Sequence, residues 1–203
     1  MSPVKAVVFD VGKVLVEWDL RHLFAKLIAD GQELEWFVTT VVTPEWHFQH
    51  DAGRDLDEMV EERCGEYPDH APLIRAYAAR FNESIPGPVP GSLELLAALG
   101  AAGVPLFALT NFGDVLWDRF RPTMPQFAVF RDILVSGVEK LAKPDPAIYR
   151  LAEARFGFAG PDVLFIDDRD DNVDAAASSC GWQVHHFTGA ARLEADLRVR
   201  GLI

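Results

Sequence analysis

Residues 4–15 read VKAVVFDVGKVL, a short apolar run that ends in an acid. Residues 6–9 are all apolar, Asp10 follows them, and Gly12 comes two positions later. A segment that is apolar on both faces is typical of a buried parallel strand. Open α/β sheets bind ligands beyond the carboxyl ends of their strands, which is where Asp10 would lie. Because an unpaired buried carboxylate is costly, this stretch predicts a cation or hydrogen-bond donors beside Asp10.

The composition fits an ordinary globular protein of one domain with a modest insertion. The chain has 203 residues, of which 49% are hydrophobic and 25% charged, and its formal net charge is −12. That charge argues against sequence-independent binding to nucleic acid. An acidic protein can still bind an anion through a local cation, so the charge does not reveal the substrate.

Cysteine usage and hydropathy bear on the compartment. The two cysteines, Cys64 and Cys180, are far apart and lack metal-ligand spacing, so we interpret them as reduced thiols. No apolar run approaches the roughly 20 residues of a membrane span, and the N-terminus lacks the apolar core of a signal peptide. We expect a cytoplasmic protein without membrane or nucleic-acid partners, either a monomer or a homodimer.

Residues 17–86 have the pattern of an all-helical block. Apolar residues recur at helical spacing within this block, and Asp19 is placed to cap its first helix. The predicted helices cover residues 20–31, 32–42, 55–65 and 72–84. Residues 44–49 bring three aromatic rings together without a predicted helix, and residues 51–54 have the composition of a turn.

Strands and helices alternate after the proline- and glycine-rich hinge IPGPVPG at residues 85–91. Strands are predicted over residues 104–109, 133–136, 163–166 and 183–187, and helices over 92–100, 115–120, 146–156, 172–179 and 192–200. This order predicts an α/β fold: a Rossmann-like parallel sheet in a three-layer α/β/α core. The core would comprise residues 1–16 and 87–203. The all-helical cap, residues 17–86, would lie above Asp10 as a lid.

Polar side chains end three of the predicted strands. The first strand ends at Asp10, the second at Thr110 and Asn111, and a later one at Asp167 and Asp168. Three acids at one edge of a sheet repel one another unless a cation neutralises them. Oxygen ligands of this kind suit Mg²⁺. The sequence therefore predicts a magnesium site at this edge.

Lys143, in KLAKPDP, adds a fixed positive charge between the last two of these strands. With Mg²⁺ it would spread the charge that develops on phosphoryl oxygens, while Thr110 and Asn111 donate hydrogen bonds to them. Asp10, ionised at neutral pH, could attack phosphorus and form an aspartyl-phosphate that water then cleaves. This set of residues favours phosphoryl transfer.

Four segments together resemble the motifs of the haloacid dehalogenase superfamily, in the branch with a helical cap after the first motif. They are VVFDVGKVL, FALTNF, AKPDPAIY and FIDDRDDN, and they span nearly the whole chain. The resemblance implies a hydrolase of phosphoric monoesters with Mg²⁺ as cofactor. It implies these roles: Asp10 as nucleophile and metal ligand, Thr110, Asn111 and Lys143 as phosphate-binding residues, and Gly12 (through its carbonyl), Asp168 and Asp167 as further metal ligands. Asp168 would bind the metal directly, and Asp167 would lie beside it.

The motif departs from most phosphatases of the family at Gly12, where they carry a second aspartate that acts as general acid and base. DVGKVL is similar to the first motif of a subset of sugar-phosphate phosphatases, which reads Asp-Leu-Gly-Asn-Val. In this chain Lys13 stands where that subset has asparagine. The leading interpretation is a phosphatase of a small phosphorylated metabolite, with a sugar phosphate as the candidate substrate. The alternatives are a 2-haloacid dehalogenase, a mutase, or a non-catalytic binding protein on the same fold.

Residues of the lid are the candidates for substrate specificity. Trp46, His47 and His50 lie close together in the sequence, and we expect Trp46 and His47 to contact substrate. The imidazole of His47 could also supply the proton that Gly12 cannot, since histidine titrates near neutral pH. In the acidic motif, either Asp171 or Asn172 would cap the following helix while the other orders water around the metal.

Overall fold

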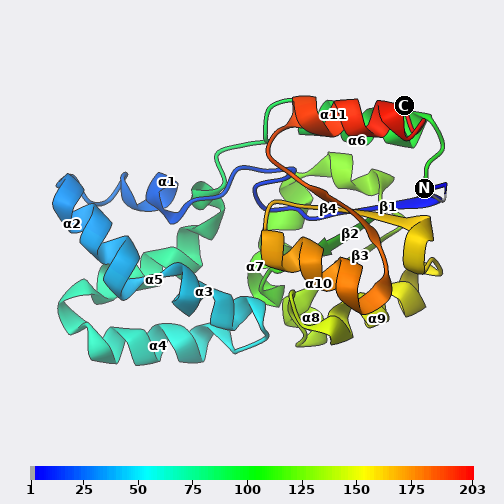
Figure 1. The fold of residues 1–203 in the computed structure, drawn as a ribbon. Coiled ribbons are helices and arrows are strands. Elements are labelled where there is room, and N and C mark those ends of the chain that lie inside the picture. The colour runs from blue at the N-terminus through cyan, green and yellow to red at the C-terminus, as the bar shows by residue number, and fades with distance from the viewer. Residues whose placement is uncertain (1–2) are drawn as a thin grey trace.

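The structure is a computed structural model and describes residues 3–203. Its centre is a sheet of five parallel strands in the order β3-β2-β1-β4-β5 (Figure 1). The strands are β1 Ala6–Phe9, β2 Leu106–Thr110, β3 Asp132–Val135, β4 Val163–Asp167 and β5 Gln183–His186. The strand that carries the opening sequence lies in the middle, between β2 and β4.

Helices cover both faces of the sheet, because both faces are apolar. Val7 and Phe9 belong to one buried cluster with α6 and α11, whereas Ala6 and Val8 belong to another with α9 and α10. Side chains alternate between faces along a strand, so a continuous apolar run has to be buried on both. The helices of this part are α6 Ser92–Ala101, α7 Asp114–Phe120, α8 Ser136–Glu139, α9 Pro146–Phe156, α10 Asp170–Cys180 and α11 Ala190–Val199. The predicted three-layer α/β/α fold is confirmed.

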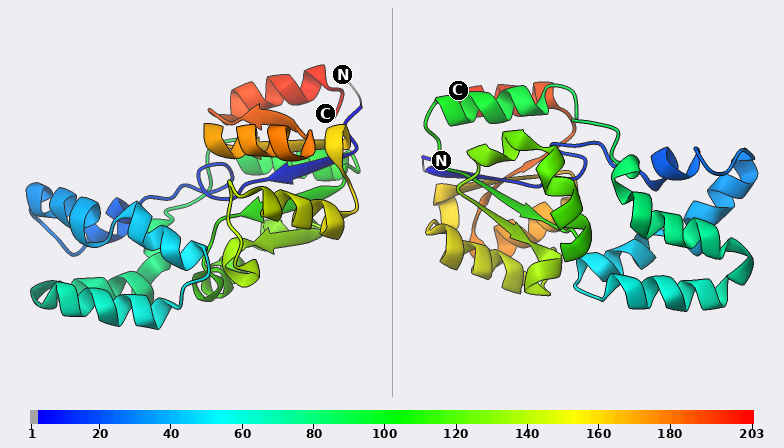
Figure 2. Two further views of the ribbon diagram at one scale, coloured as in Figure 1. Left: turned by 60° about the horizontal axis from the view of Figure 1, so that its bottom comes forward. Right: turned by 180° about the vertical axis from the view of Figure 1, so that it is seen from behind.

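The helices between β1 and α6 form a second lobe beside the sheet (Figures 1 and 2). They are α1 Leu20–Phe24, α2 Gly31–Trp36, a π-helical turn Phe37–Val41, α3 Pro44–Asp51, α4 Leu56–Glu66 and α5 Ala71–Arg80. We call this lobe the cap. Its boundaries at residues 16/17 and 86/87 stay a prediction.

Two antiparallel segments connect the cap to the sheet, and they pair through their backbones. Glu17 N–H donates to Gly87 O at 2.9 Å, Val89 N–H donates to Leu15 O at 3.0 Å, and Asp19 N–H donates to the carbonyl of Ser84. The proline- and glycine-rich hinge is therefore half of a paired connection. Its partner is the segment that follows β1.

Helix α3 corrects the prediction for residues 44–49, where no helix was predicted, whereas the turn predicted over residues 51–54 is present at Ala52 and Gly53. The Thr43 hydroxyl caps the helix by accepting from Trp46 N–H, and Pro44 occupies the first turn. Both are ordinary helix-start signals. The helix was missed because its buried face includes His47, His50 and Asp51, so that it has no apolar stripe.

Other boundaries also differ from the prediction. The helix predicted over residues 20–31 ends at Phe24, and a separate helix begins at Gly31, capped by the side chain of Asp30. Helix α10 begins at Asp170, two residues before the predicted start. Among residues 3–203, no helix is long and apolar enough to cross a membrane.

Candidate active site

The acids at the strand ends meet at the carboxyl edge of the sheet. Asp10 follows β1, Asp167 ends β4, and Asp168 comes next. One carboxylate oxygen from each lies within 4.8 Å of the other two. The structure thus brings together the three acids that the sequence singled out, because β1 and β4 are hydrogen-bonded neighbours.

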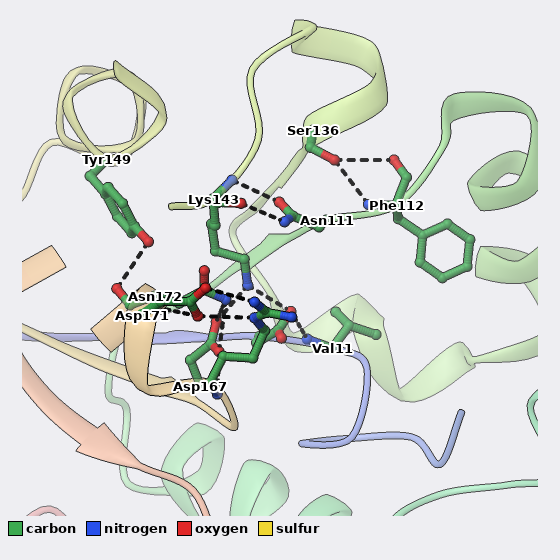
Figure 3. A network of polar contacts seen from close by, with 11 residues as sticks. Val11, Asn111, Phe112, Ser136, Lys143, Tyr149, Asp167, Asp171 and Asn172 are labelled. Carbon is green, nitrogen blue, oxygen red and sulfur yellow. Dashed lines mark hydrogen bonds and ion pairs between the residues drawn. The ribbon is translucent and has the colours of Figure 1, made fainter. Parts of the chain in front are cut away.

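Lys143 is the fixed cation of this edge. Its Nζ lies 2.9 Å from Asp10 Oδ1 and 2.6 Å from Asp167 Oδ2 (Figure 3). The side chain is only 1% exposed. Burial alone would lower the pKa of this ammonium, but the charges of Asp10 and Asp167 outweigh burial and raise it. Lys143 is therefore a permanent positive charge between two carboxylates.

Asp167 is fully buried and its oxygens are already engaged. Besides Lys143, it accepts from the Arg169 N–H at 2.9 Å and from Asn172 Nδ2 at 2.9 and 3.0 Å. The carbonyl of Asn172 in turn accepts from the Tyr149 hydroxyl at 3.0 Å (Figure 3). Asp167 does not line the cavity described below. Its geometry suits anchoring Lys143 better than direct metal ligation.

The cluster of side chains around Asp10 has a net negative charge. Its Oδ1 accepts from the Val11 N–H at 2.7 Å and contacts Lys143. Burial raises the pKa of Asp10 to about 7, Lys143 opposes this rise, and Asp167 and Asp168 add to it. One lysine faces three acids, so this cluster favours a further cation.

The donors present fit a hard divalent cation. Asp10 and Asp168 both line the cavity with carboxylate oxygens, and burial also raises the pKa of Asp168. The Oδ1 atom of Asn172 is buried without a hydrogen-bond partner among the described residues, and Asn172 lines the same cavity. Carboxylate and amide oxygens are the ligands that Mg²⁺ prefers. Gly12 lines the cavity as well, and its role as a carbonyl ligand stays a prediction.

Asn111 of the second motif holds the backbone of Lys143 in place. Asn111 Nδ2 donates to Lys143 O, and the Lys143 N–H donates to Asn111 Oδ1, both at 2.9 Å (Figure 3). The Asn111 amide thus braces the Lys143 backbone. Asn111 also lines the cavity described below, and its predicted use as a donor to substrate stays a prediction. Thr110 is buried at the end of β2 and does not line the cavity, and its predicted phosphate contact stays a prediction.

A cavity of about 490 Å³ opens between the sheet edge and the cap. Its floor is formed by Asp10, Lys143, Asp168 and Asn172. Its opposite side includes Trp18, Pro44, His47, Phe48, Asp51 and Phe81. The volume is within the range of about 300–1,000 Å³ that is usual for ligand sites. The cap therefore closes over the strand-end acids, as the sequence predicts for an insertion after β1.

Helix α3 holds the cap against the core. The Ser136 hydroxyl donates to the carbonyl of Asp51 at 2.5 Å and accepts from the Phe112 N–H at 2.9 Å. The ring of His50 packs on Gly113, where an added Cβ would lie 1.9 Å from His50 Cδ2. Only glycine allows this close approach.

His47 lines the cavity, but its ring is engaged within the cap. Nδ1 lies 2.6 Å from the Tyr77 hydroxyl, and Nε2 lies 3.2 Å from Asp51 Oδ2. The ring stacks between Trp18 and Phe81, with centroids at 4.9 and 5.4 Å. Because both nitrogens already face protein partners, this geometry weakens the hypothesis that His47 gives a proton to the leaving group.

Trp46 has a different place from the predicted one. It is 3% exposed, packs edge-on against Tyr77 at 5.0 Å, and lies beneath the guanidinium of Arg63. It does not line the cavity. The prediction that Trp46 contacts substrate is therefore replaced by a role in cap packing.

Sequence reasoning missed Asp51, Phe81 and Phe112 as cavity residues. Asp51 stands four residues after His47, a spacing that places both on one face of a helix. That signal was available only if residues 44–51 were recognised as helical. Phe81 and Phe112 carry no local signal, because an aromatic ring in a helical segment or after a strand is ordinary core composition.

A family model described as haloacid dehalogenase-like hydrolase matches residues 4–179. Two curated proteins are also similar. One is acyl-CoA dehydrogenase family member 10 of Mus musculus, 26% identical over 192 residues, or 86% of this chain; the alignment covers only 17% of the mouse protein. The other is the sesquiterpene phosphatase astK of Aspergillus oryzae, 24% identical over 96% of this chain and 95% of that protein.

Solved structures share the fold. The magnesium complex of the HAD family enzyme bt-2542 from Bacteroides thetaiotaomicron superposes with a TM-score of 0.74 at 17% identity, over 97% of this chain and all of that one. An L-2-haloacid dehalogenase from Xanthobacter autotrophicus, with chloropropionic acid covalently bound, gives 0.64 at 19% identity, over 98% of this chain and 84% of that one. At these identities the likeness concerns the fold alone.

Proposed function

The chain belongs to the haloacid dehalogenase-like hydrolase family, and we propose that it is a Mg²⁺-dependent phosphatase of a small phosphorylated metabolite. The observation that carries the proposal is the position of Lys143, whose buried Nζ bridges Asp10 and Asp167 at 2.9 and 2.6 Å. A buried carboxylate beside a fixed cation, at the floor of a ligand-sized cavity, is suited to nucleophilic attack on phosphorus. The astK relative, whose name describes a phosphatase, supports the same chemistry.

Three residues would hold the metal in this proposal. They are Asp10 and Asp168 through carboxylate oxygens, and Gly12 through its carbonyl, with Asp167 beside them. When bound, Mg²⁺ supplies positive charge that stabilises the developing charge on phosphoryl oxygens. The unpartnered Oδ1 of Asn172 would accept from water around the metal.

Asp10 acts as the nucleophile. Its Oδ1 is held by Lys143 and by the Val11 N–H, which fixes the carboxylate and directs Oδ2 to the phosphoryl group. A bond forms between this oxygen and phosphorus while the bond to the leaving oxygen breaks, and the leaving oxygen takes a proton from water to depart as the alcohol. Water then cleaves the aspartyl-phosphate, releasing inorganic phosphate and restoring the carboxylate. Lys143 neutralises Asp10 before attack and the phosphoryl oxygens during transfer.

The cap keeps bulk water out of this site while the bond breaks. Helix α3 lies over the floor and is held there by Ser136 and by the contact of His50 with Gly113. Exclusion of water strengthens the electrostatic contacts of Lys143 with its partners. Opening and closing of the cap about the paired segments would admit substrate and release products.

A dehalogenase is the second candidate. It is favoured by Gly12, because displacement of a halide from carbon needs no proton for the leaving group. It is disfavoured by the third acid, Asp168, and by the orphaned Asn172 Oδ1, which serve a metal that halide displacement does not need. Release of chloride from a 2-chloroacid without Mg²⁺ would favour this alternative.

A panel of phosphate monoesters tests the proposal. We expect phosphate release with Mg²⁺ and loss of activity with EDTA. Asp10→Asn should lower kcat by about 10³-fold or more, because the nucleophile is removed. The matched control is Asp170→Asn, an acid of the same motif whose side chain is 79% exposed; it should retain activity. Full activity of Asp10→Asn, or no phosphate release from any monoester, would contradict the proposal.

A further inference from the structure

A ladder of aromatic rings lines the cavity from the cap to Phe112 at the sheet edge. Trp18 stacks on His47 at 4.9 Å and 27°, His47 stacks on Phe81 at 5.4 Å and 17°, and Phe81 meets Phe112 edge-on at 5.6 Å. All four line the cavity. We call Trp18, His47, Phe81 and Phe112 the aromatic wall. Because both faces of His47 are stacked against neighbouring rings, the wall offers mainly ring edges to a group attached to a phosphate bound at the floor.

The polar atoms of this wall are poorly placed to bind hydroxyl groups. His47 has its nitrogens against Tyr77 and Asp51. Trp18 Nε1 and Asp51 Oδ1 are buried and lack partners among the described residues. A sugar would leave several hydroxyls against carbon, and each buried unpaired polar group is costly.

Phe48 extends the same surface towards solvent. It lines the cavity and is 41% exposed, which is unusual for so large an apolar side chain. When an apolar ligand covers an exposed ring beside an apolar wall, removal of the ring surface from water favours binding. Three exposed charged residues, Lys13, Glu45 and Arg169, also line the cavity but are not part of the aromatic wall.

We propose that the substrate is a phosphate monoester of an apolar alcohol, of the alkyl or isoprenoid class, whose chain lies along the aromatic wall and Phe48. This inference rests on the proposed phosphatase function and narrows its substrate. The floor binds the phosphate through Lys143, and the wall binds the leaving group by burial of apolar surface. Discrimination against sugar phosphates follows from the wall's lack of accessible hydrogen-bond partners.

A chain-length series of n-alkyl phosphates tests the proposal. With Mg²⁺ and substrate below micelle formation, kcat/KM should rise about 100-fold from butyl to octyl phosphate, because each buried methylene adds apolar contact. Farnesyl phosphate should be hydrolysed at least as well as octyl phosphate. Glucose 6-phosphate and glucose 1-phosphate should fall near the butyl ester or below it.

Phe48→Ser tests the extension of the wall. It should lower kcat/KM for octyl phosphate about 10-fold and have a smaller effect on butyl phosphate. The matched control is Trp36→Ser, because Trp36 is also 41% exposed and lies on the cap, but packs against Tyr67 and His70 away from the cavity. An equal loss in both variants would contradict a role for Phe48 in binding.

The outcomes separate this inference from the proposed function. Sugar phosphates hydrolysed as well as octyl phosphate would overturn the apolar substrate and leave the phosphatase intact. If no monoester is hydrolysed, the phosphatase is wrong, and calorimetry then decides the inference. Octylphosphonate should bind the Mg²⁺-loaded protein about 100-fold more tightly than butylphosphonate. Equal affinities would overturn the inference.

Discussion

Two buried clusters face the same cavity, one from the sheet and one from the cap. In the first, Lys143 bridges Asp10 and Asp167. In the second, His47 bridges Asp51 and Tyr77. In each cluster a side-chain nitrogen lies between two oxygen atoms, on the side of its lobe that borders the cavity. They differ in charge balance, because the sheet cluster gathers three acids around one lysine, whereas the cap cluster holds one acid.

This difference separates chemistry from recognition. The excess negative charge on the sheet side is costly without a cation, so this side is suited to a metal ion, which together with Lys143 would attract a negatively charged phosphoryl group. In the cap cluster the polar atoms of His47 contact Tyr77 and Asp51, and stacked rings line the cavity. The next three experiments alter one cluster or the other, in order of decreasing expected effect.

Removing the lysine should have the largest effect on stability. Lys143→Met leaves Asp10 and Asp167 buried without their partner, which should lower the free energy of unfolding by about 3–5 kcal/mol, measured by urea denaturation. Lys5→Met is the control, because Lys5 also pairs with an acid, Asp162, at 2.9 Å, but with 58% of its side chain exposed. That change should cost about 1 kcal/mol or less.

A second substitution sharpens the result. Asp167→Asn in the Lys143→Met background should restore part of the lost stability, since it removes one of the two stranded charges. If Lys143→Met and Lys5→Met lower the free energy of unfolding by the same amount, the buried acids of the sheet cluster do not depend on Lys143 for their stability.

Metal and pH should act together on the sheet cluster. The pKa of Asp10 is raised from 3.8 to about 7 in the folded, metal-free protein, chiefly by burial. Between these values the folded state holds more protons than the unfolded state, so stability from this group falls as pH rises and is lowest above about pH 7. Mg²⁺ competes with that proton.

Thermal melts with Mg²⁺ and with EDTA check this expectation. Mg²⁺ should raise Tm more at about pH 8 than at about pH 5, by a difference of several degrees, which corresponds to about 2 kcal/mol for a chain of this size. Asp10→Asn should remove most of the pH dependence of the Mg²⁺ effect. A Mg²⁺ shift that is the same at both pH values would argue against Asp10 as a ligand.

The cap cluster should show the smallest effect. His47→Phe keeps a ring between Trp18 and Phe81 but leaves the Tyr77 hydroxyl and Asp51 Oδ2 without their partner. We expect a loss of about 1–2 kcal/mol in unfolding free energy. The pH profile of kcat should keep its shape, since both nitrogens of His47 face the cap.

Tyr77→Phe is the companion variant, because it removes the same hydrogen bond from the other side. The double variant should cost less than the sum of the two single changes. A pH profile that loses one limb only in His47→Phe would restore His47 as a proton donor and break the division between the two clusters.

Local sequence was enough to locate the sheet and its acids. An apolar run that stops at a carboxylate marks a buried strand end, and the strands bearing Asp10, Asn111 and Asp167 are neighbours in the sheet. Helix α3 escaped prediction because its buried face is polar, so that periodicity gave no signal. The same helix carries His47 and Asp51, and the cap side of the site was therefore the part least visible in the sequence.

The sequence by itself determined the α/β fold, the convergence of Asp10, Asp167 and Asp168, and the presence of a lysine to balance them. Strand periodicity and the abrupt change from apolar to acidic residues are local properties, readable without a structure. Tertiary structure alone decided how these groups are used. It engaged Asn111 with the Lys143 backbone and enclosed Asp167 completely. It also built a cavity wall from rings at positions 18, 47, 81 and 112, because packing between segments far apart in the chain depends on shape rather than on any local pattern.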